Sequence, residues 1–163
     1  MVRGRALETR YGSLEARGRS LEARRGLEAR EAGEPFAAQA VDVLAAAAAS
    51  VVWDWSKVAL VANADGALPG IQTYALLIWN GRGFEGWMPA EAIEDLNRVL
   101  ARWRAELERL SRPVWAALFV GVVNDRGRLR SRWIVADDGD FDAWQIRLGE
   151  SNVPMAERGL AGL

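Results

Sequence analysis

The stretch WAALFVGVVNDRGRLRSRWIVA, residues 115–136, consists of two strand-like segments around a turn signal. Residues 115–123 are almost continuously apolar, and Asn124-Asp-Arg-Gly127 is a hairpin-turn sequence. In residues 128–136, successive side chains point to opposite faces of a predicted strand. One side carries Leu129, Ser131, Trp133 and Val135, and the other carries Arg128, Arg130, Arg132 and Ile134. The stretch therefore predicts an antiparallel β-hairpin.

The segment before this hairpin has the clearest helical periodicity in the chain. Residues 89–111 place an apolar side chain at every third or fourth position, and Pro113 follows as a stop signal. The apolar positions are Ile93, Leu96, Leu100, Trp103, Leu107 and Leu110. We expect an amphipathic helix whose apolar stripe faces the core.

Three weaker patterns complete the domain. Residues 36–49 are rich in alanine and predict a helix, whereas residues 57–63 and 71–79 predict two short apolar strands. The order is then helix, strand, strand, helix, strand, strand. It predicts an α+β fold with an antiparallel sheet and both helices packed on one face.

The sequence NGRGFEGW, residues 80–87, contains three glycines with the spacing of a dinucleotide-binding fingerprint. In that fingerprint the third glycine lies in the first helical turn, and an acidic residue follows about twenty residues later, after a second parallel strand. Here the helix is expected to begin only at Pro89, and Glu106 and Glu108 would lie inside it. Asn80-Gly81 favours a type I′ hairpin turn instead. We therefore expect a turn and no bound cofactor.

Residues 1–34 have a different composition from the rest. A degenerate Leu-Glu-Ala-Arg repeat begins at Leu7, Leu14, Leu21 and Leu27. A leucine every seven residues is typical of coiled coils, but each repeat has one apolar anchor, and glycines at 12, 18, 26 and 33 interrupt the run. We expect residues 1–34 to be a low-complexity extension, disordered or a fraying helix, and residues 35–163 to form a single α+β domain. Deleting residues 1–34 should then leave the melting temperature nearly unchanged.

The chain of 163 residues contains no cysteine and no histidine. Disulfides, thiol catalysis, Ser-His-Asp systems and imidazole or thiolate metal sites are thereby excluded. Carboxylates, arginines and hydroxyls are what remains for catalysis, and we expect neither an enzyme nor a metal site. No run of eighteen apolar residues occurs, which predicts a cytoplasmic protein without a membrane span.

A basic strand face, formed by Arg128, Arg130 and Arg132, is the candidate for nucleic-acid binding. It lacks an aromatic residue on the same side, and the chain from residue 35 onward carries thirteen basic against sixteen acidic residues. The pattern therefore favours an exposed strand face, and we expect no nucleic-acid partner.

Asp137, Asp138, Asp140 and Asp142 form an acidic run directly after the last predicted strand. Counted from Asp138, the run begins like a calcium-binding loop. However, position 6 is alanine and position 12 is glycine, where such a loop needs glycine and glutamate. A solvated loop and an acidic patch facing a protein partner both remain open. In the second case the partner-binding residues are Asp137, Asp138, Asp140, Asp142 and Trp144.

Several short motifs lie between residues 36 and 145. Trp55-Ser-Lys-Val-Ala-Leu-Val-Ala62 fits a W-x-x-V-x-L-x-A strand, Tyr74 lies in the second strand, and residues 113–118 fit P-x-W-x-x-L. The hairpin carries Asp125-Arg-Gly-Arg-Leu129, and acidic residues close the last strand. With the two predicted helices, these motifs make the chain similar to the YezG-like immunity proteins, which are bacterial antitoxins against secreted polymorphic toxins.

The resemblance implies a non-enzymatic immunity protein that binds a cognate toxin domain, for example a nuclease, inside the producing cell. The aspartates would mimic nucleic-acid phosphates and steer a basic toxin site into contact. The residues leave two other functions open. One is an enzyme that uses a divalent metal held by residues 137–142, and the other is a small structural interaction module.

Overall fold

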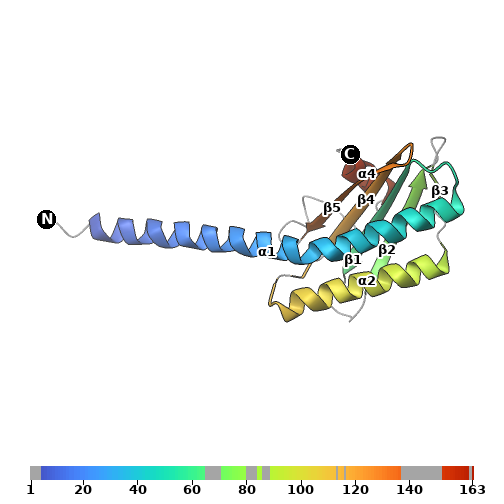
Figure 1. Ribbon diagram of the computed structural model, residues 1–163. Helices are drawn as coiled ribbons and strands as arrows, with labels where there is room; N and C mark the ends of the chain where they lie inside the picture. The colour runs from blue at the N-terminus through green and yellow to red at the C-terminus, as the bar shows by residue number, and fades with distance from the viewer. Residues whose placement is uncertain are drawn as a thin grey trace.

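The fold is built around an antiparallel sheet that has helices on both faces (Figure 1). The computed structural model describes residues 5–64, 71–79, 84–85, 89–112, 114–115, 117–136, 152–161 and 163. The described elements, in chain order, are α1 (Arg5–Val51), β1 (Lys57–Ala64), β2 (Ile71–Trp79), β3 (Phe84–Glu85), α2 (Ala90–Arg109), β4 (Ala117–Asp125), β5 (Arg128–Ala136) and α4 (Asn152–Leu160).

The described sheet has the strand order β3-β2-β1-β4-β5, and each neighbouring pair is antiparallel. β1 is the central strand and is buried on both sides. Val58, Leu60 and Ala62 belong to the core beneath α1 and α2, whereas Ala59 and Val61 belong to a second cluster beneath α4. Its almost continuous apolar sequence suits this central position, because neither face is exposed to water. The α+β class, the antiparallel sheet and the order of helices and main strands predicted from the sequence are confirmed.

α1 and α2 cover one face of the sheet and run in opposite directions (Figure 1). The predicted apolar stripe of α2 is buried at Leu96, Leu100, Trp103 and Leu107. α1 buries mainly alanines, at positions 37, 40, 47 and 48. Because alanine is small, the backbone of α1 can approach its neighbours closely while the larger side chains of α2 fill the remaining space.

α4 packs on the opposite face of the sheet, and the sequence analysis did not predict it. Ala156 and Leu160, four residues apart on one side of α4, join Ala59, Val61 and Phe119 in the second cluster. The approach is close, because a Cβ atom added at Gly121 or Gly159 would collide with the ring of Phe119. The helices predicted from sequence do share one face, but this third helix makes the described fold three layers deep.

Two antiparallel strand pairs, β4–β5 and β2–β3, join strands that are consecutive in the chain. In the β4–β5 hairpin, Asp125 pairs with Arg128, so Arg126 and Gly127 form a two-residue loop. Both have positive φ, 51° and 90°, which is the type I′ conformation. In the β2–β3 hairpin, Trp79 pairs with Phe84. The chain therefore folds back after Trp79 as predicted, whereas the turn expected at Asn80-Gly81 lies outside the described residues.

α1 does not end at the composition change between residues 34 and 35. It is one helix of 47 residues with Pro35 inside it, and it is about 70 Å long at about 1.5 Å per residue. Ala29, Ala32 and Phe36 pack against the core on both sides of the proline, and Gly33 is buried. This packing stabilises the helix through Pro35, which removes one backbone donor. The domain contacts therefore begin near residue 28, and the part of α1 before them projects away from the sheet (Figure 1).

Two glycines of the repeat provide a test of this packing. A Cβ at Gly33 would lie 2.7 Å from the ring of Trp103, whereas a Cβ at Gly26 would meet nothing within 4 Å. Overpacking costs about 1–3 kcal/mol, more than the gain of about 1 kcal/mol in helix propensity. Gly33→Ala should therefore lower the melting temperature measured by circular dichroism, and Gly26→Ala should not. Equal shifts in the two variants would contradict the contact.

Two deletions test where the contacts begin. Removing residues 1–26 should leave the melting temperature nearly unchanged, because Leu21 is 57% exposed and a Cβ at Gly18 or Gly26 would meet nothing within 4 Å. Removing residues 1–34 should lower it by several degrees, because Glu28, Ala29, Ala32 and Gly33 contact the domain. From composition alone we expected the deletion of residues 1–34 to leave the melting temperature nearly unchanged. The contacts of residues 28–33 replace that expectation with a lower melting temperature. Identical melting curves for the two deletions would show that residues 27–34 do not stabilise the domain.

Candidate interaction surface

The acidic run proposed as the partner site lies outside the described residues. This holds for Asp137, Asp138, Asp140, Asp142 and Trp144 alike. Its two flanks are described: β5 ends at Ala136, and α4 begins at Asn152 on the other side of the gap. The run therefore starts one residue after an edge strand and leads toward the helix on the opposite face of the sheet from α1 and α2.

The strand register fixes the end of the sheet at which this run begins. Ala136 pairs with Ala117, which in turn pairs with Asn63 near the end of β1. Trp133, three residues earlier, lies against Arg30 of α1, with 5.6 Å between the guanidinium carbon and the ring centroid. The acidic run thus begins at the end of the sheet where α1 leaves the domain.

Most side chains of β5 are exposed. It is the outermost strand beside β4. Arg128, Arg130 and Arg132 are exposed, and so are Leu129 (48%) and Val135 (42%). Trp133 and Ile134 pack on opposite sides, against the α1–α2 core and the α4 cluster respectively. The predicted alternation and the exposed arginine face are confirmed, and arginines on an edge strand discourage pairing with another strand.

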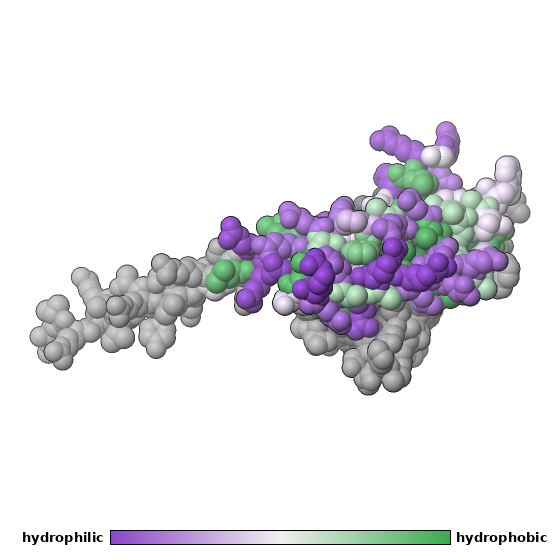
Figure 2. Space-filling view, turned by 60° about the horizontal axis from the view of Figure 1, so that its bottom comes forward, coloured by the Kyte–Doolittle hydropathy of each residue, from purple (hydrophilic) through white to green (hydrophobic). Residues whose placement is uncertain are grey.

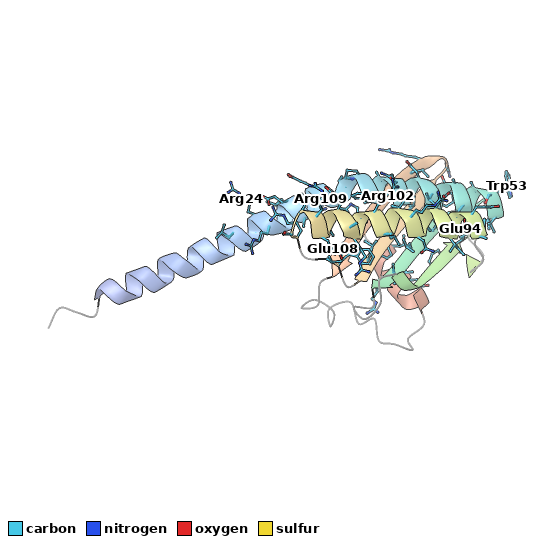
Figure 3. The ribbon with its side chains drawn as sticks, turned by 90° about the horizontal axis from the view of Figure 1, so that it is seen from below. Arg24, Trp53, Glu94, Arg102, Glu108 and Arg109 are labelled. Atoms are coloured by element: carbon cyan, nitrogen blue, oxygen red, sulfur yellow. The ribbon has the colours of Figure 1, made fainter. Side chains whose placement is uncertain are left out.

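Trp53 is an exposed aromatic residue at the other end of the sheet. It lies between α1 and β1, and its side chain is 92% exposed, whereas Trp55 two residues later is 6% exposed. Figure 3 shows Trp53 at the end of the molecule toward which Glu94 of α2 also lies. The two tryptophans are equally hydrophobic, but of the two only Trp55 is packed in the core. Exposed tryptophans are enriched at protein interfaces, so Trp53 is a second candidate contact residue.

An aromatic cluster of Phe36, Trp103, Trp115 and Trp133 connects α1, α2 and the sheet. The Trp103 ring stacks on Phe36 with centroids 6.3 Å apart. It meets Trp115 and Trp133 edge-on at 6.2 and 5.2 Å. These rings join elements that are far apart in sequence, so the cluster is a structural element and not a ligand cage.

Charged side chains cover the aromatic cluster. Arg104 lies over Trp115 at 5.7 Å, and Arg112 forms an ion pair with Glu28 of α1. Elsewhere on α2, Arg109 donates two hydrogen bonds to Glu106, at 2.8 and 2.7 Å, which lowers the pKa of that carboxyl. Arg109 and Glu106 are three residues apart on a helix surface, an arrangement that supports the helix.

The residues of two alternative interpretations lie outside the described part: Gly81, Gly83 and Gly86 of the glycine fingerprint, and the acidic run of residues 137–142 for the metal enzyme. The described sheet is antiparallel throughout, whereas a dinucleotide fingerprint needs parallel strands with a crossover helix. No group of three or more Asp and Glu residues in the described part could hold a metal ion.

None of the described helices is apolar enough over a sufficient length to cross a membrane. On the face shown in Figure 2, hydrophilic residues surround smaller hydrophobic areas of the described residues.

No protein-family model matches the chain, and the search of curated proteins finds no match either. Its function is therefore inferred from its residues and their arrangement.

Trp53 and Trp55 form a matched pair for mutation. Trp53→Ala should change the free energy of unfolding by no more than about 0.5 kcal/mol, because the side chain buries little surface. Trp55→Ala should cost about 3–5 kcal/mol, because it empties a buried site. Urea denaturation of both variants measures the difference. A large loss in Trp53→Ala would show that this indole is packed in solution.

Proposed function

We propose that the chain is an immunity protein that binds a cognate toxin domain in the cytoplasm of the producing cell. The acidic run of residues 137–142, with Trp144, is the proposed contact surface, and the partner is a basic domain such as a nuclease. The observation that supports this most is the position of the run, which begins directly after the edge strand β5.

The charge of this segment supports a basic partner. Residues 137–146 contain four aspartates and no basic residue, so they carry a charge of −4. The preceding strand carries exposed arginines at 128, 130 and 132 instead. A negative segment beside a positive strand face orients an approaching partner, because each charge attracts only one side of it.

The proposed mechanism requires no chemistry from the chain. The aspartates would take the place of nucleic-acid phosphates in the basic site of the toxin, and Trp144 would supply apolar contact area within an otherwise polar surface. Binding would then inhibit the toxin by occupying its substrate site. This function needs carboxylates but neither histidine nor cysteine, and the chain contains no histidine and no cysteine.

Replacing Asp137, Asp138, Asp140 and Asp142 with asparagine should weaken toxin binding and leave the melting temperature nearly unchanged. The association rate at low salt should fall by at least about tenfold, because charge attraction steers the encounter. The difference from the wild type should shrink at high salt, since charges are screened beyond roughly 10 Å at 0.1 M. Surface plasmon resonance against the toxin domain encoded beside this gene measures both effects.

A second variant with the same change in net charge is the matched control. Asp42, Asp54, Glu91 and Glu94 are exposed on α1, on α2 and in the α1–β1 connection. Neutralising these four should alter the association rate much less. Trp53, which precedes Asp54, and Glu94, one helical turn after Glu91, lie toward the end of the molecule opposite the one where α1 projects (Figure 3). An equal fall in the association rate of the two variants would show that net charge alone, and not the position of the acidic run, determines this rate.

Other outcomes decide between the proposed functions. If divalent ions raise the melting temperature of the wild type but not of the quadruple asparagine variant, the carboxylates hold a metal, and the enzyme interpretation replaces this one. If the wild type binds no toxin domain encoded beside its gene, the immunity function is wrong.

A further inference from the structure

The projecting part of α1 has no covering element among the described residues. Leu21 and Leu27 are 57% and 63% exposed, and a Cβ added at Gly18 or Gly26 would meet nothing within 4 Å. A single helix is marginal in water, and each glycine inside it costs roughly 1 kcal/mol relative to alanine. At Gly18, Leu21, Gly26 and Leu27, this part of α1 therefore has no packing against the described residues of its own chain, although such packing normally stabilises a helix.

The sequence of this segment has a seven-residue periodicity along the helix. Leu7, Leu14 and Leu21 recur every seventh residue and form the leucine stripe. With these leucines at position d of the heptad, position e is glutamate in all three repeats and position g is arginine in all three. The e positions are Glu8, Glu15 and Glu22, and the g positions are Arg10, Arg17 and Arg24.

We propose that this segment of α1 pairs with the same segment of a second copy of the chain, as a parallel, in-register, two-stranded coiled coil. In a parallel pair, position g faces position e of the next heptad on the partner helix. Arg10 then faces Glu15 and Arg17 faces Glu22, and the symmetry of the pair repeats both contacts. In an antiparallel pair, g faces g and e faces e, which sets arginine against arginine and glutamate against glutamate. The charges therefore fit a parallel pair and oppose an antiparallel one.

The direction of the leucine stripe leaves the domain contacts of α1 intact. Leu21 and Gly33 are twelve residues apart, which places them about 120° apart around a helix of 3.6 residues per turn. Gly33 faces Trp103. A second helix that packs on the leucine stripe therefore does not occupy the face of α1 that contacts its own domain. In the pair, the two domains lie on different sides of the coiled-coil axis.

The other core positions make this pair weak and dependent on concentration. Position a is Tyr11, Gly18 and Arg25 in successive heptads, so one position lacks a side chain and one carries a charge. Two-stranded coiled coils of high stability carry apolar residues at both a and d. We therefore expect an equilibrium between monomer and dimer.

Sedimentation equilibrium of the full chain, over a range of concentrations at low salt, tests the pairing. The wild type should show a monomer–dimer equilibrium. Leu21→Ala should raise the dimer dissociation constant by at least about tenfold, because two leucines are lost from the seam of each dimer. Leu27→Ala is the matched control, since Leu27 is at least as exposed but lies about 120° from Leu21 around the helix. It should leave the equilibrium unchanged.

A charge exchange tests the contact between g and e. Arg17→Glu should weaken the dimer because it opposes Glu22 of the partner, and Glu22→Arg should weaken it because it opposes Arg17. The double variant restores opposite charges and should recover most of the wild-type affinity. A structural effect on the single helix would not produce this rescue, since residues 17 and 22 are five apart and do not face each other on one helix.

Cysteine cross-linking tests the direction of the pair, because the wild type contains no cysteine. In the parallel pair the two copies of residue 21 face each other, so Leu21→Cys should form a disulfide-linked dimer under mild oxidation. Leu27→Cys should not. In an antiparallel pair of the same stripe, residue 21 faces residue 7, and the two cysteines are about 21 Å apart.

Three results would overturn the proposal. The first is a full chain that stays monomeric at millimolar concentration, and the second is an equal effect of Leu21→Ala and Leu27→Ala on association. The third is a disulfide that forms through residue 27 and not through residue 21. None of these results depends on toxin binding, so they leave the proposed immunity function unaffected.

Discussion

Burial of the Trp103 indole is the contact on which the arrangement of the helices depends. Its ring is 1% exposed and packs against Phe36 of α1, Trp115 before β4 and Trp133 of β5. The close approach of α1 is possible because Gly33 has no side chain to displace the ring. Buried aromatic rings contribute a large apolar area, and pairs of such rings favour particular orientations. One side chain of α2 thereby fixes α1 in position and in rotation about its axis.

This fixed orientation decides what the remainder of α1 can do. Because the helix is continuous through Pro35, the direction of the projecting segment follows from the docked one. Glu28 pairs with Arg112, and Arg30 lies over Trp133, so charged residues hold α1 at the point where it leaves the domain. The acidic run begins near the same end of the sheet, four residues after Trp133. The proposed toxin contact and the proposed helix pair therefore belong to one end of the molecule, whereas exposed Trp53 belongs to the other.

The sheet and its two main helices could be read from local patterns. The Arg126-Gly127 turn, the continuous apolar run of β4 and the apolar stripe of α2 each reflect an interaction between residues close in sequence. α4 left a weaker signal, the four-residue spacing of Ala156 and Leu160, because its position depends on how Gly159 and Gly121 surround Phe119. Trp53 and Trp55 are equally hydrophobic, and their exposures differ because only one side of the connection faces the core.

The sequence by itself determined the α+β class, the order of the two main helices and four main strands, and the absence of thiol and imidazole chemistry, since periodicity and composition are local properties. The acidic run and its partner stay predictions from sequence, because residues 137–151 lie outside the described residues. Only the tertiary structure decided where the packing of the domain begins. Residues 28–33 resemble the rest of the repeat in composition, yet Gly33 and Ala29 pack against the core, whereas Leu27 is exposed. The physical reason is the Trp103 ring, which is seventy residues from Gly33 in sequence. The part of α1 that lies against this ring is buried.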